Sequence, residues 1–169
     1  MISIDEALLA RVCALGDVLR ARGWRLATAE SCTGGLLAGA CTAPAGASDW
    51  FAAGFVTYAN DAKTGLLGVP EALIVDHGAV SAEVADAMAR GALAHAKVQL
   101  ALSVTGIAGP GGGSAAKPVG TVWLGLAWRG VAGVENSTER LNLGGDRAAI
   151  RAQTVDIALR RLLAAAGAA

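Results

Sequence analysis

Residues 28–35, TAESCTGG, bring together side chains that could carry out covalent chemistry: a carboxylate, hydroxyls, a thiol and a glycine pair. They follow a short apolar run and precede the small-residue stretch LLAGACTA, which predicts a strand-to-helix turn. A serine at such a turn can hold its Oγ near backbone N–H groups that favour a developing negative charge. The simpler explanation is that Ser31 or Thr33 only caps the helix. Taken alone, the pattern favours the cap.

A nucleophilic serine needs a base, and the segment TYANDAK supplies the best candidates, Tyr58 and Lys63. A lysine kept neutral by desolvation can accept the serine proton, and a tyrosine can relay a proton or orient the amine. The two histidines fit less well, because His77 falls in a predicted turn and His95 late in a predicted helix. Taken alone, Lys63 would be interpreted as an ordinary surface lysine. Its position beside Tyr58 in the polar segment TYANDAK is what favours a role as the base.

Cys32 is a rival nucleophile, since a thiol at a helix N-terminus has a lowered pKa. It could equally pack as a small apolar residue, as we expect for Cys13 and Cys41. Three cysteines without a C-x-x-C pair argue against disulfides and against a cysteine zinc site. This cysteine usage predicts a reducing, cytoplasmic setting.

The stretch GIAGPGGGSAAKPVG, residues 106–120, is rich in glycine and is predicted to be a loop. It matches neither a Walker A loop nor G-x-G-x-x-G, so the usual motifs for ATP or dinucleotide binding are absent from it. Its backbone N–H groups could still bind a phosphate or a carboxylate, although a flexible surface loop is the simpler explanation. Thr105, at the end of the preceding strand, favours a site. Arg147 could pair with a phosphate or simply begin an exposed helix.

The predicted elements alternate along the chain. Ser3 and Glu6 have capping-box spacing, and apolar residues at 8, 12, 15 and 19 give the first helix one buried face, up to Gly23. Strands are expected over 24–29, 50–59, 98–106, 121–128 and 132–143, the last two joined by a turn at 129–130. Further helices are expected over 34–42, within 60–70, over 82–96 after the N-cap Ser81, and from the N-cap Asp146 onward, with a buried stripe at 148, 152, 155, 159 and 162.

This order predicts an α/β fold, a single three-layer α/β/α sandwich over residues 1–169 with a mixed, mostly parallel sheet. In such sheets, ligands bind beyond the carboxyl ends of the parallel strands. Three of these ends are polar, namely AESCTGG, TYANDAK and TGIAGPGGG. We therefore expect the three segments to converge on one site.

Composition limits the possible partners. The chain has 14 basic and 14 acidic residues, so its net charge does not favour a nucleic acid or a membrane surface. No apolar run is long enough for a spanning helix, and the acidic N-terminal stretch is not typical of a signal peptide. Neither kind of partner is expected.

Five stretches together resemble the CinA C-terminal domain family: TAESCTGGLLAG, GFVTYANDAKTGLLGV, HGAVSAEVADAMARGAL, SVTGIAGPGGGSAAKPVGTV and GDRAAIRAQTVDIAL. They occur in order and span nearly the whole chain. The family's stand-alone members are nicotinamide-nucleotide amidohydrolases (NMN deamidases). The resemblance implies a three-layer fold and hydrolysis of nicotinamide mononucleotide to nicotinate mononucleotide and ammonia, in pyridine-nucleotide recycling. Activities of the family's N-terminal nucleotide-hydrolase domain are not expected here.

By position, the resemblance implies that Ser31 is the nucleophile and that Tyr58 and Lys63 activate it. Ala59 and Asp61 differ from the serine and glutamate common in relatives, but neither change removes a proposed catalytic group. The substrate-contact elements implied by the resemblance are Thr105, Gly106 and the GPGGG loop, which holds Gly109, Gly111 and Gly112.

Our hypothesis from the sequence is a serine amidohydrolase that needs no metal and no organic cofactor. Neutral Lys63 accepts the Ser31 proton, Ser31 attacks the nicotinamide carbonyl, and backbone N–H groups around Cys32 to Gly34 stabilise the oxyanion. The glycine loop, with Arg147 as a helper, meets the substrate phosphate. The turn residues assigned to substrate binding are Glu30, Cys32, Thr33, Gly34 and Gly35, and Glu30 would orient either Lys63 or a substrate hydroxyl.

Two rival hypotheses remain open. One is a non-catalytic regulatory module that binds a nucleotide or a protein, which the family's link to competence-related proteins suggests. The other is an amidohydrolase that acts on a different amide. A homo-oligomer, dimeric or larger, is expected from the alanine-rich helices and from the resemblance.

Overall fold

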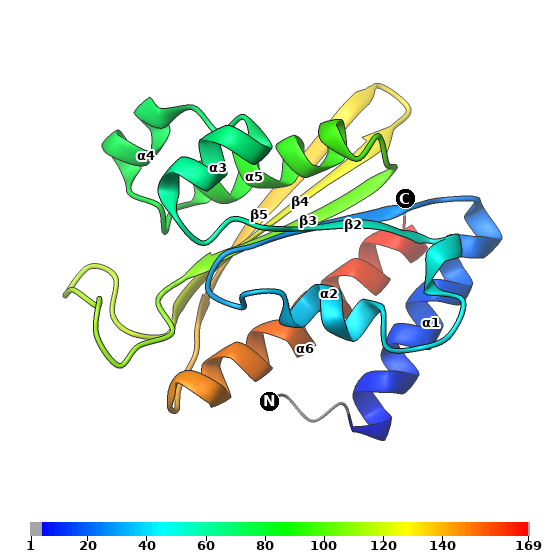
Figure 1. Ribbon diagram of the computed structural model, residues 1–169, viewed down its shortest axis with the longest axis horizontal. Coiled ribbons are helices and arrows are strands. Elements are labelled where there is room, and N and C mark those ends of the chain that lie inside the picture. Colours follow the sequence, from blue (N-terminus) through cyan, green and yellow to red (C-terminus); the bar gives the residue numbers. More distant parts are fainter. Residues whose placement is uncertain (1–4, 169) are drawn as a thin grey trace.

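The computed structural model describes residues 5–168. It contains a five-stranded sheet between two layers of helices (Figure 1). The strands are β1 (Leu26–Glu30), β2 (Phe51–Val56), β3 (Leu100–Gly106), β4 (Thr121–Gly130) and β5 (Gly133–Asn142), in the spatial order β2-β1-β3-β4-β5. β1 is parallel to both β2 and β3, whereas β4 is antiparallel to both β3 and β5, so four of the five strands point the same way. The predicted three-layer α/β fold with a mixed sheet is confirmed.

Helices cover both faces of the sheet. One face carries α1 (Glu6–Arg22), α2 (Leu36–Cys41) and α6 (Arg147–Ala168), and the other carries α3 (Asn60–Leu67), α4 (Glu71–His77) and α5 (Ala82–His95) (Figure 1). A short 3₁₀ helix, η1 (Ala47–Asp49), leads into β2. Within residues 5–168, no helix combines the length and the apolar character that crossing a bilayer requires.

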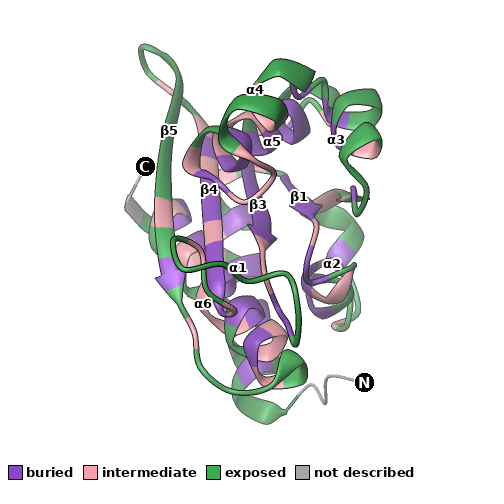
Figure 2. Cartoon of the chain, turned by 90° about the vertical axis from the view of Figure 1, so that its left-hand side faces the viewer, coloured by how far each residue is buried: buried purple, intermediate pink, exposed green. Residues whose placement is uncertain are grey.

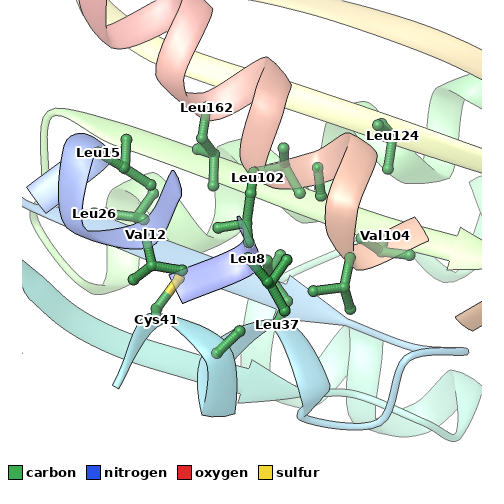
Figure 3. Packing of buried hydrophobic residues seen from close by; sticks show 14 of the residues in the cluster. Leu8, Val12, Leu15, Leu26, Leu37, Cys41, Leu102, Val104, Leu124 and Leu162 are labelled. Carbon is green, nitrogen blue, oxygen red and sulfur yellow. The ribbon is translucent and has the colours of Figure 1, made fainter. Parts of the chain in front are cut away.

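Two hydrophobic cores lie on the two faces of the sheet. The larger one joins α1, α2 and α6 to the sheet, where Leu15, Cys41 and Leu162 surround Leu102 of β3 (Figure 3). The smaller one lies under α5 and is built largely of small side chains, such as Ala101. Because β1 and β3 are buried on both faces, their carboxyl ends are held firmly in the middle of the molecule.

Several local predictions were wrong at the level of single residues. The N-cap of α1 is Asp5, whose carboxylate accepts the Leu8 N–H at 2.8 Å, while Ser3 lies outside the described residues. Cys13, expected in the core, is exposed. The hairpin turn lies at 131–132 instead of 129–130, because β4 and β5 pair out to Gly130 and Gly133.

Two helices also differ from the prediction. α4 was not predicted as a separate helix: it follows Pro70, buries none of its residues fully and is mostly exposed in Figure 2. Leu73 and Ile74 pack partly against the core, so its apolar stripe is short. In α6, Ala148 is exposed and the buried stripe begins at Ile150. The predicted caps are confirmed, since Ser81 Oγ accepts the Val84 N–H and the Asp146 carboxylate that of Ala149.

Gly125 of β4 allows α5 to pack closely against the sheet. A Cβ at this position would lie 2.3 Å from the carbonyl oxygen of Ala85 and 2.6 Å from Ser103 Oγ. Gly125→Ala is therefore expected to lower the free energy of unfolding by about 1–3 kcal/mol, because α5 must move away from β4. Gly39→Ala is the control, since its Cβ would meet nothing within 4 Å and alanine favours a helix interior. Urea unfolding measures the free energy of unfolding of both variants. Equal values for Gly125→Ala and Gly39→Ala would contradict close packing of α5 at Gly125.

Candidate active site

The carboxyl ends of β1, β2 and β3 lie next to one another in the sheet and carry the polar segments of the sequence. Ser31 directly follows β1, Thr57 and Tyr58 follow β2, and Thr105 lies near the end of β3. The chain after β2 turns into α3, which carries Lys63 back toward this edge. Side chains distant in sequence therefore meet here.

Lys63 is the central side chain of this edge. Its exposed fraction is 1%, and its Nζ lies 3.3 Å from Ser31 Oγ, 2.9 Å from the carbonyl oxygen of Thr57 and 3.2 Å from that of Tyr58. Burial lowers the pKa of the Lys63 amine below its ordinary value of 10.5. No carboxylate of the described residues lies within ion-pair distance of Nζ, and the neighbouring Cys32, which acts in the opposite direction, has the smaller effect on this pKa.

The turn from 31 to 35 positions Ser31 between two parts of the backbone. Its N–H donates to the Val104 carbonyl at 2.9 Å, and its own carbonyl accepts the Gly34 N–H at 3.0 Å. Gly34 and Gly35 have φ angles of 60° and 95°, a left-handed conformation that suits glycine.

The backbone N–H groups of the same turn differ in whether another group of the protein accepts their hydrogen bond. Those of Cys32 and Thr33 find no oxygen acceptor among the described residues, whereas that of Gly34 is bound to the Ser31 carbonyl. Cys32 and Thr33 therefore supply the donors that a developing oxyanion beside Ser31 could use. Gly34, for which we predicted the same role, contributes the bend instead.

Glu30 lies directly before Ser31 and is completely buried. Its carboxylate accepts three backbone N–H groups, those of Gly35 at 3.1 Å, Leu37 at 3.0 Å and Ala38 at 2.8 Å. It makes no contact with Lys63. The geometry favours a role in holding the turn over the substrate contact that we predicted for it.

Cys32, the rival nucleophile, is 5% exposed. Burial raises the pKa of its thiol to about 11, and the neighbouring Glu30 carboxylate acts in the same direction. The thiol is thus protonated at neutral pH, and Lys63 Nζ is hydrogen-bonded to Ser31 Oγ instead. The geometry favours Ser31 as the nucleophile.

Tyr58 contributes its backbone and its side chain to different parts of the site. Its carbonyl accepts from Lys63, but its side chain is 62% exposed and its hydroxyl accepts the Arg147 Nη2–H at 3.1 Å. Arg147 also donates from Nη1 to the Gly109 carbonyl at 3.0 Å, which ties the glycine loop to the segment after β2. The predicted contact of the phenol with Ser31 and Lys63 is not present.

The strand end of β3 and the glycine loop differ in how accessible they are. Thr105 is 1% exposed, and its hydroxyl donates to the Ala79 carbonyl at 2.7 Å, so it anchors the segment before α5. Gly106 is half-buried and Gly109 buried, while Gly111 and Gly112 are exposed. The outer part of the loop is therefore the part with free backbone for a ligand.

Arg151 is the functional candidate that sequence reasoning missed. It lies one helical turn after Arg147 on α6, its Nη2 donates to the Thr33 carbonyl at 2.9 Å, and its Nε is buried without a hydrogen-bond partner. Spacing of i and i+4 puts two side chains on the same helix face, so the pair could have been detected once Arg147 was suspected.

Histidines and metal ligands do not gather at this edge. His77 Nδ1 lies 3.5 Å from a Glu83 carboxylate oxygen, and His95 Nδ1 lies 2.8 Å from the Gly91 carbonyl. Neither ring contacts Ser31 or Lys63. In the part of the chain that the structure describes, no three His, Cys, Asp or Glu side chains come together as a metal site would require.

Comparison with known proteins gives a consistent picture. The model of the CinA C-terminal domain family matches residues 10–166. The nicotinamide-nucleotide amidohydrolase PncC of Pseudomonas putida is 54% identical over 149 residues, 88% of this chain and 91% of that protein, and PncC of Escherichia coli strain K12 is 48% identical, covering 94% of both. A CinA-like protein of Geobacter sp. strain M21 is 57% identical over 88% of this chain, which spans only 35% of that protein.

Solved structures agree with these relatives. The competence/damage inducible protein CihA from Agrobacterium tumefaciens superposes with a TM-score of 0.91 at 43% identity, covering 97% of this chain and 98% of that one. A CinA superfamily protein from Escherichia coli superposes with a TM-score of 0.87 at 36% identity, covering 96% and 93%. The similarity in sequence and the similarity in fold therefore both extend over most of the chain.

Proposed function

The chain belongs to the CinA C-terminal domain family, and we propose that it hydrolyses the carboxamide of nicotinamide mononucleotide to nicotinate mononucleotide and ammonia. The proposal draws on two relatives, the PncC proteins, which are named for this activity and match most of the chain. The observation that carries it is the buried Lys63 amine beside Ser31 Oγ. This pairing provides a nucleophile and a base in the one place where the three polar strand ends meet.

The hydrogen bonds of Lys63 suit a neutral amine. Such an amine has two N–H bonds and one lone pair, and the carbonyls of Thr57 and Tyr58 accept the two N–H bonds. The third contact of Nζ is with Ser31 Oγ at 3.3 Å. In the proposed neutral state the lone pair occupies this position, and the serine hydroxyl is then the donor. Lys63 is thus oriented to remove the proton from Ser31.

The reaction would proceed in two halves. Ser31 Oγ attacks the carboxamide carbon while its proton moves to Lys63, and the N–H groups of Cys32 and Thr33 stabilise the oxyanion. The C–N bond then breaks as protonated Lys63 passes its proton to the departing nitrogen, which leaves as ammonia. In the second half, Lys63 takes a proton from water, hydroxide attacks the acyl ester, and the proton returns to Ser31 Oγ as the carboxylate is released.

Arg147 and Arg151 are the groups proposed to bind the substrate phosphate, together with the outer glycine loop. Both side chains point from one face of α6 to the rim of the Ser31 turn and the loop. Guanidinium groups bind phosphate through paired, charge-assisted hydrogen bonds. Because Arg147 contacts only a carbonyl and a phenol oxygen among residues 5–168, its charge is available to an anion.

Arg147→Gln is expected to lower kcat/KM for nicotinamide mononucleotide by about 10- to 100-fold, the worth of a charged hydrogen bond. Nicotinamide riboside, which has no phosphate, should be affected far less. Steady-state kinetics with both substrates measures the difference. Arg160→Gln is the control, because Arg160 lies on the same helix and pairs with Asp156. An equal loss with both substrates would contradict a phosphate contact.

The proposed activity is tested by ammonia release from nicotinamide mononucleotide, nicotinamide, NAD and glutamine. Release from the first alone is the expected result, whereas release from another amide would support a different amidohydrolase. No release from any of them, with nucleotide binding retained, would support the non-catalytic regulatory module and overturn the proposal. No metal or organic cofactor is added in this assay, since the proposed chemistry uses only side chains and water.

The setting and assembly of the enzyme are also part of the proposal. The three cysteines are free, which suits the reducing cytoplasm where pyridine nucleotides would be recycled. We keep the prediction of a single domain over 1–169 that forms a homo-oligomer. β2 supports an oligomer, because it is an edge strand, FAAGFV, without any charge or proline to prevent pairing with a second copy. Light scattering should give a mass of at least two chains, and a monomer would contradict it.

A further inference from the structure

We infer that Glu30 is a positioning residue, which closes the turn after β1 so that Ser31 Oγ faces Lys63 and the N–H groups of Cys32 and Thr33 stay free of oxygen acceptors. The inference rests on the proposed function, in which Ser31 is the nucleophile. It assigns a task to the one buried carboxylate next to Ser31, which the reaction itself does not use.

The contacts of Glu30 span the whole turn. Its Oε2 accepts the N–H groups of Gly35 and Leu37, and its Oε1 accepts that of Ala38. Gly35, at the N-cap position of α2, provides no side chain for these donors. The carboxylate of Glu30 thus replaces a conventional N-cap side chain, but from the strand that precedes the turn.

This arrangement decides which N–H groups of the turn remain available. The N–H of Gly34 is bound by the Ser31 carbonyl and that of Leu36 by the Thr33 carbonyl, and Glu30 accepts those of 35, 37 and 38. Every donor from 34 to 38 is therefore satisfied internally. The N–H groups of Cys32 and Thr33, beside Ser31, are the ones in this turn without an oxygen acceptor among the described residues.

A buried carboxylate has to be compensated, and here the backbone does so. Glu30 is completely buried, and no basic side chain of residues 5–168 lies within ion-pair distance of it. Three N–H donors at hydrogen-bonding distance provide the compensation. Because its oxygens are engaged with α2, Glu30 neither holds a proton on Lys63 nor has an open oxygen for substrate.

Glu30→Gln tests the inference with almost no change in shape. The amide keeps one acceptor oxygen but turns an NH₂ group toward N–H donors, so at least one of the three bonds is lost. We expect kcat for nicotinamide mononucleotide to fall about 100-fold, as for a small displacement of reacting groups, with little change in KM. Hydrogen exchange should be faster at Gly35, Leu37 and Ala38 and unchanged in α5.

Asp5→Asn is the matched control, because it removes the charge of another helix cap, at α1, without touching the turn. It should keep the kcat of the unchanged protein. Glu30→Asp keeps the charge on a shorter side chain, so its kcat is expected to fall less than that of Glu30→Gln. It replaces Glu30→Gln as the test if the glutamine variant does not fold.

Three results would overturn the positioning role: an unchanged kcat, a raised KM with unchanged kcat, or faster exchange throughout the protein without a local difference at the turn. The exchange measurement needs no turnover. If the unchanged protein released no ammonia from any amide, the proposed function would fail, while exchange at 35–38 would still decide whether Glu30 holds the turn.

Discussion

Ser31→Ala is expected to reduce ammonia release from nicotinamide mononucleotide by roughly 10⁴-fold or more, the scale on which enzymes lose rate without their nucleophile. Ser31 Oγ is the only hydroxyl oxygen of the described residues that Lys63 Nζ contacts. Alanine removes this oxygen and leaves the turn in place, because the bonds from Ser31 N–H to Val104 and from Gly34 N–H to Ser31 are made by the backbone. Binding of the substrate should therefore persist.

Cys32→Ala is the matched control for Ser31→Ala, since it removes a neighbouring nucleophile from the same turn. The Cys32 thiol is buried and its pKa is raised to about 11, so it is not ionised at neutral pH. We expect this variant to keep most of the ammonia release, measured with a coupled ammonia assay. The nucleophile is misassigned if Cys32→Ala loses turnover and Ser31→Ala keeps it.

Lys63→Met should lower kcat by about 100- to 10,000-fold, the usual contribution of a general base, while calorimetry finds substrate binding largely intact. Methionine has a similar length and fits a buried position but cannot accept a proton. Lys97→Met, at an exposed lysine before β3, is the control and should keep full activity. Retained turnover in Lys63→Met would exclude Lys63 as the base.

The pH dependence of the unchanged enzyme should reveal the same group. Because burial lowers the pKa of Lys63, the neutral amine becomes available below pH 10.5, and kcat/KM is expected to rise with pH through this lowered pKa and then level off. A kcat/KM that does not increase with pH anywhere below pH 10.5 would contradict a lysine base.

Stability should depend on pH in the same interval. Between the lowered pKa of the folded state and the ordinary value of 10.5 in the unfolded chain, the unfolded state binds more protons. The free energy of unfolding therefore rises as the pH rises through this interval, and below the folded pKa the cost of burying a protonated Lys63 has its full size. Urea unfolding over this pH range should show that rise in the unchanged protein and a smaller one in Lys63→Met.

The sequence was sufficient to predict the meeting of Ser31 and Lys63, which are 32 positions apart. The reason is geometric: both follow parallel strands, and the carboxyl ends of neighbouring parallel strands share one edge of the sheet. The strands themselves are predictable because their apolar runs and the glycine-rich segments between them are distinct. The resemblance to the family added the roles expected of Ser31, Tyr58 and Lys63 at these strand ends.

Side-chain direction is what the sequence could not provide. Tyr58 was expected beside Lys63, yet its backbone carbonyl fills that place while its phenol reaches Arg147. Glu30 was expected to face Lys63 or substrate, but its carboxylate instead accepts backbone N–H groups at the start of α2. Such choices depend on competition among donors in three dimensions, which residue spacing does not encode.

The central claim is that hydrolysis passes through an ester of Ser31, and mass spectrometry of the acid-quenched enzyme tests it most directly. The enzyme is mixed with excess nicotinamide mononucleotide, quenched during steady turnover, digested and analysed for the peptide that contains Ser31. We predict a nicotinate mononucleotide acyl group on Ser31, lost after hydroxylamine treatment and absent from Ser31→Ala. An acyl group on Cys32, or full turnover by Ser31→Ala, would contradict it.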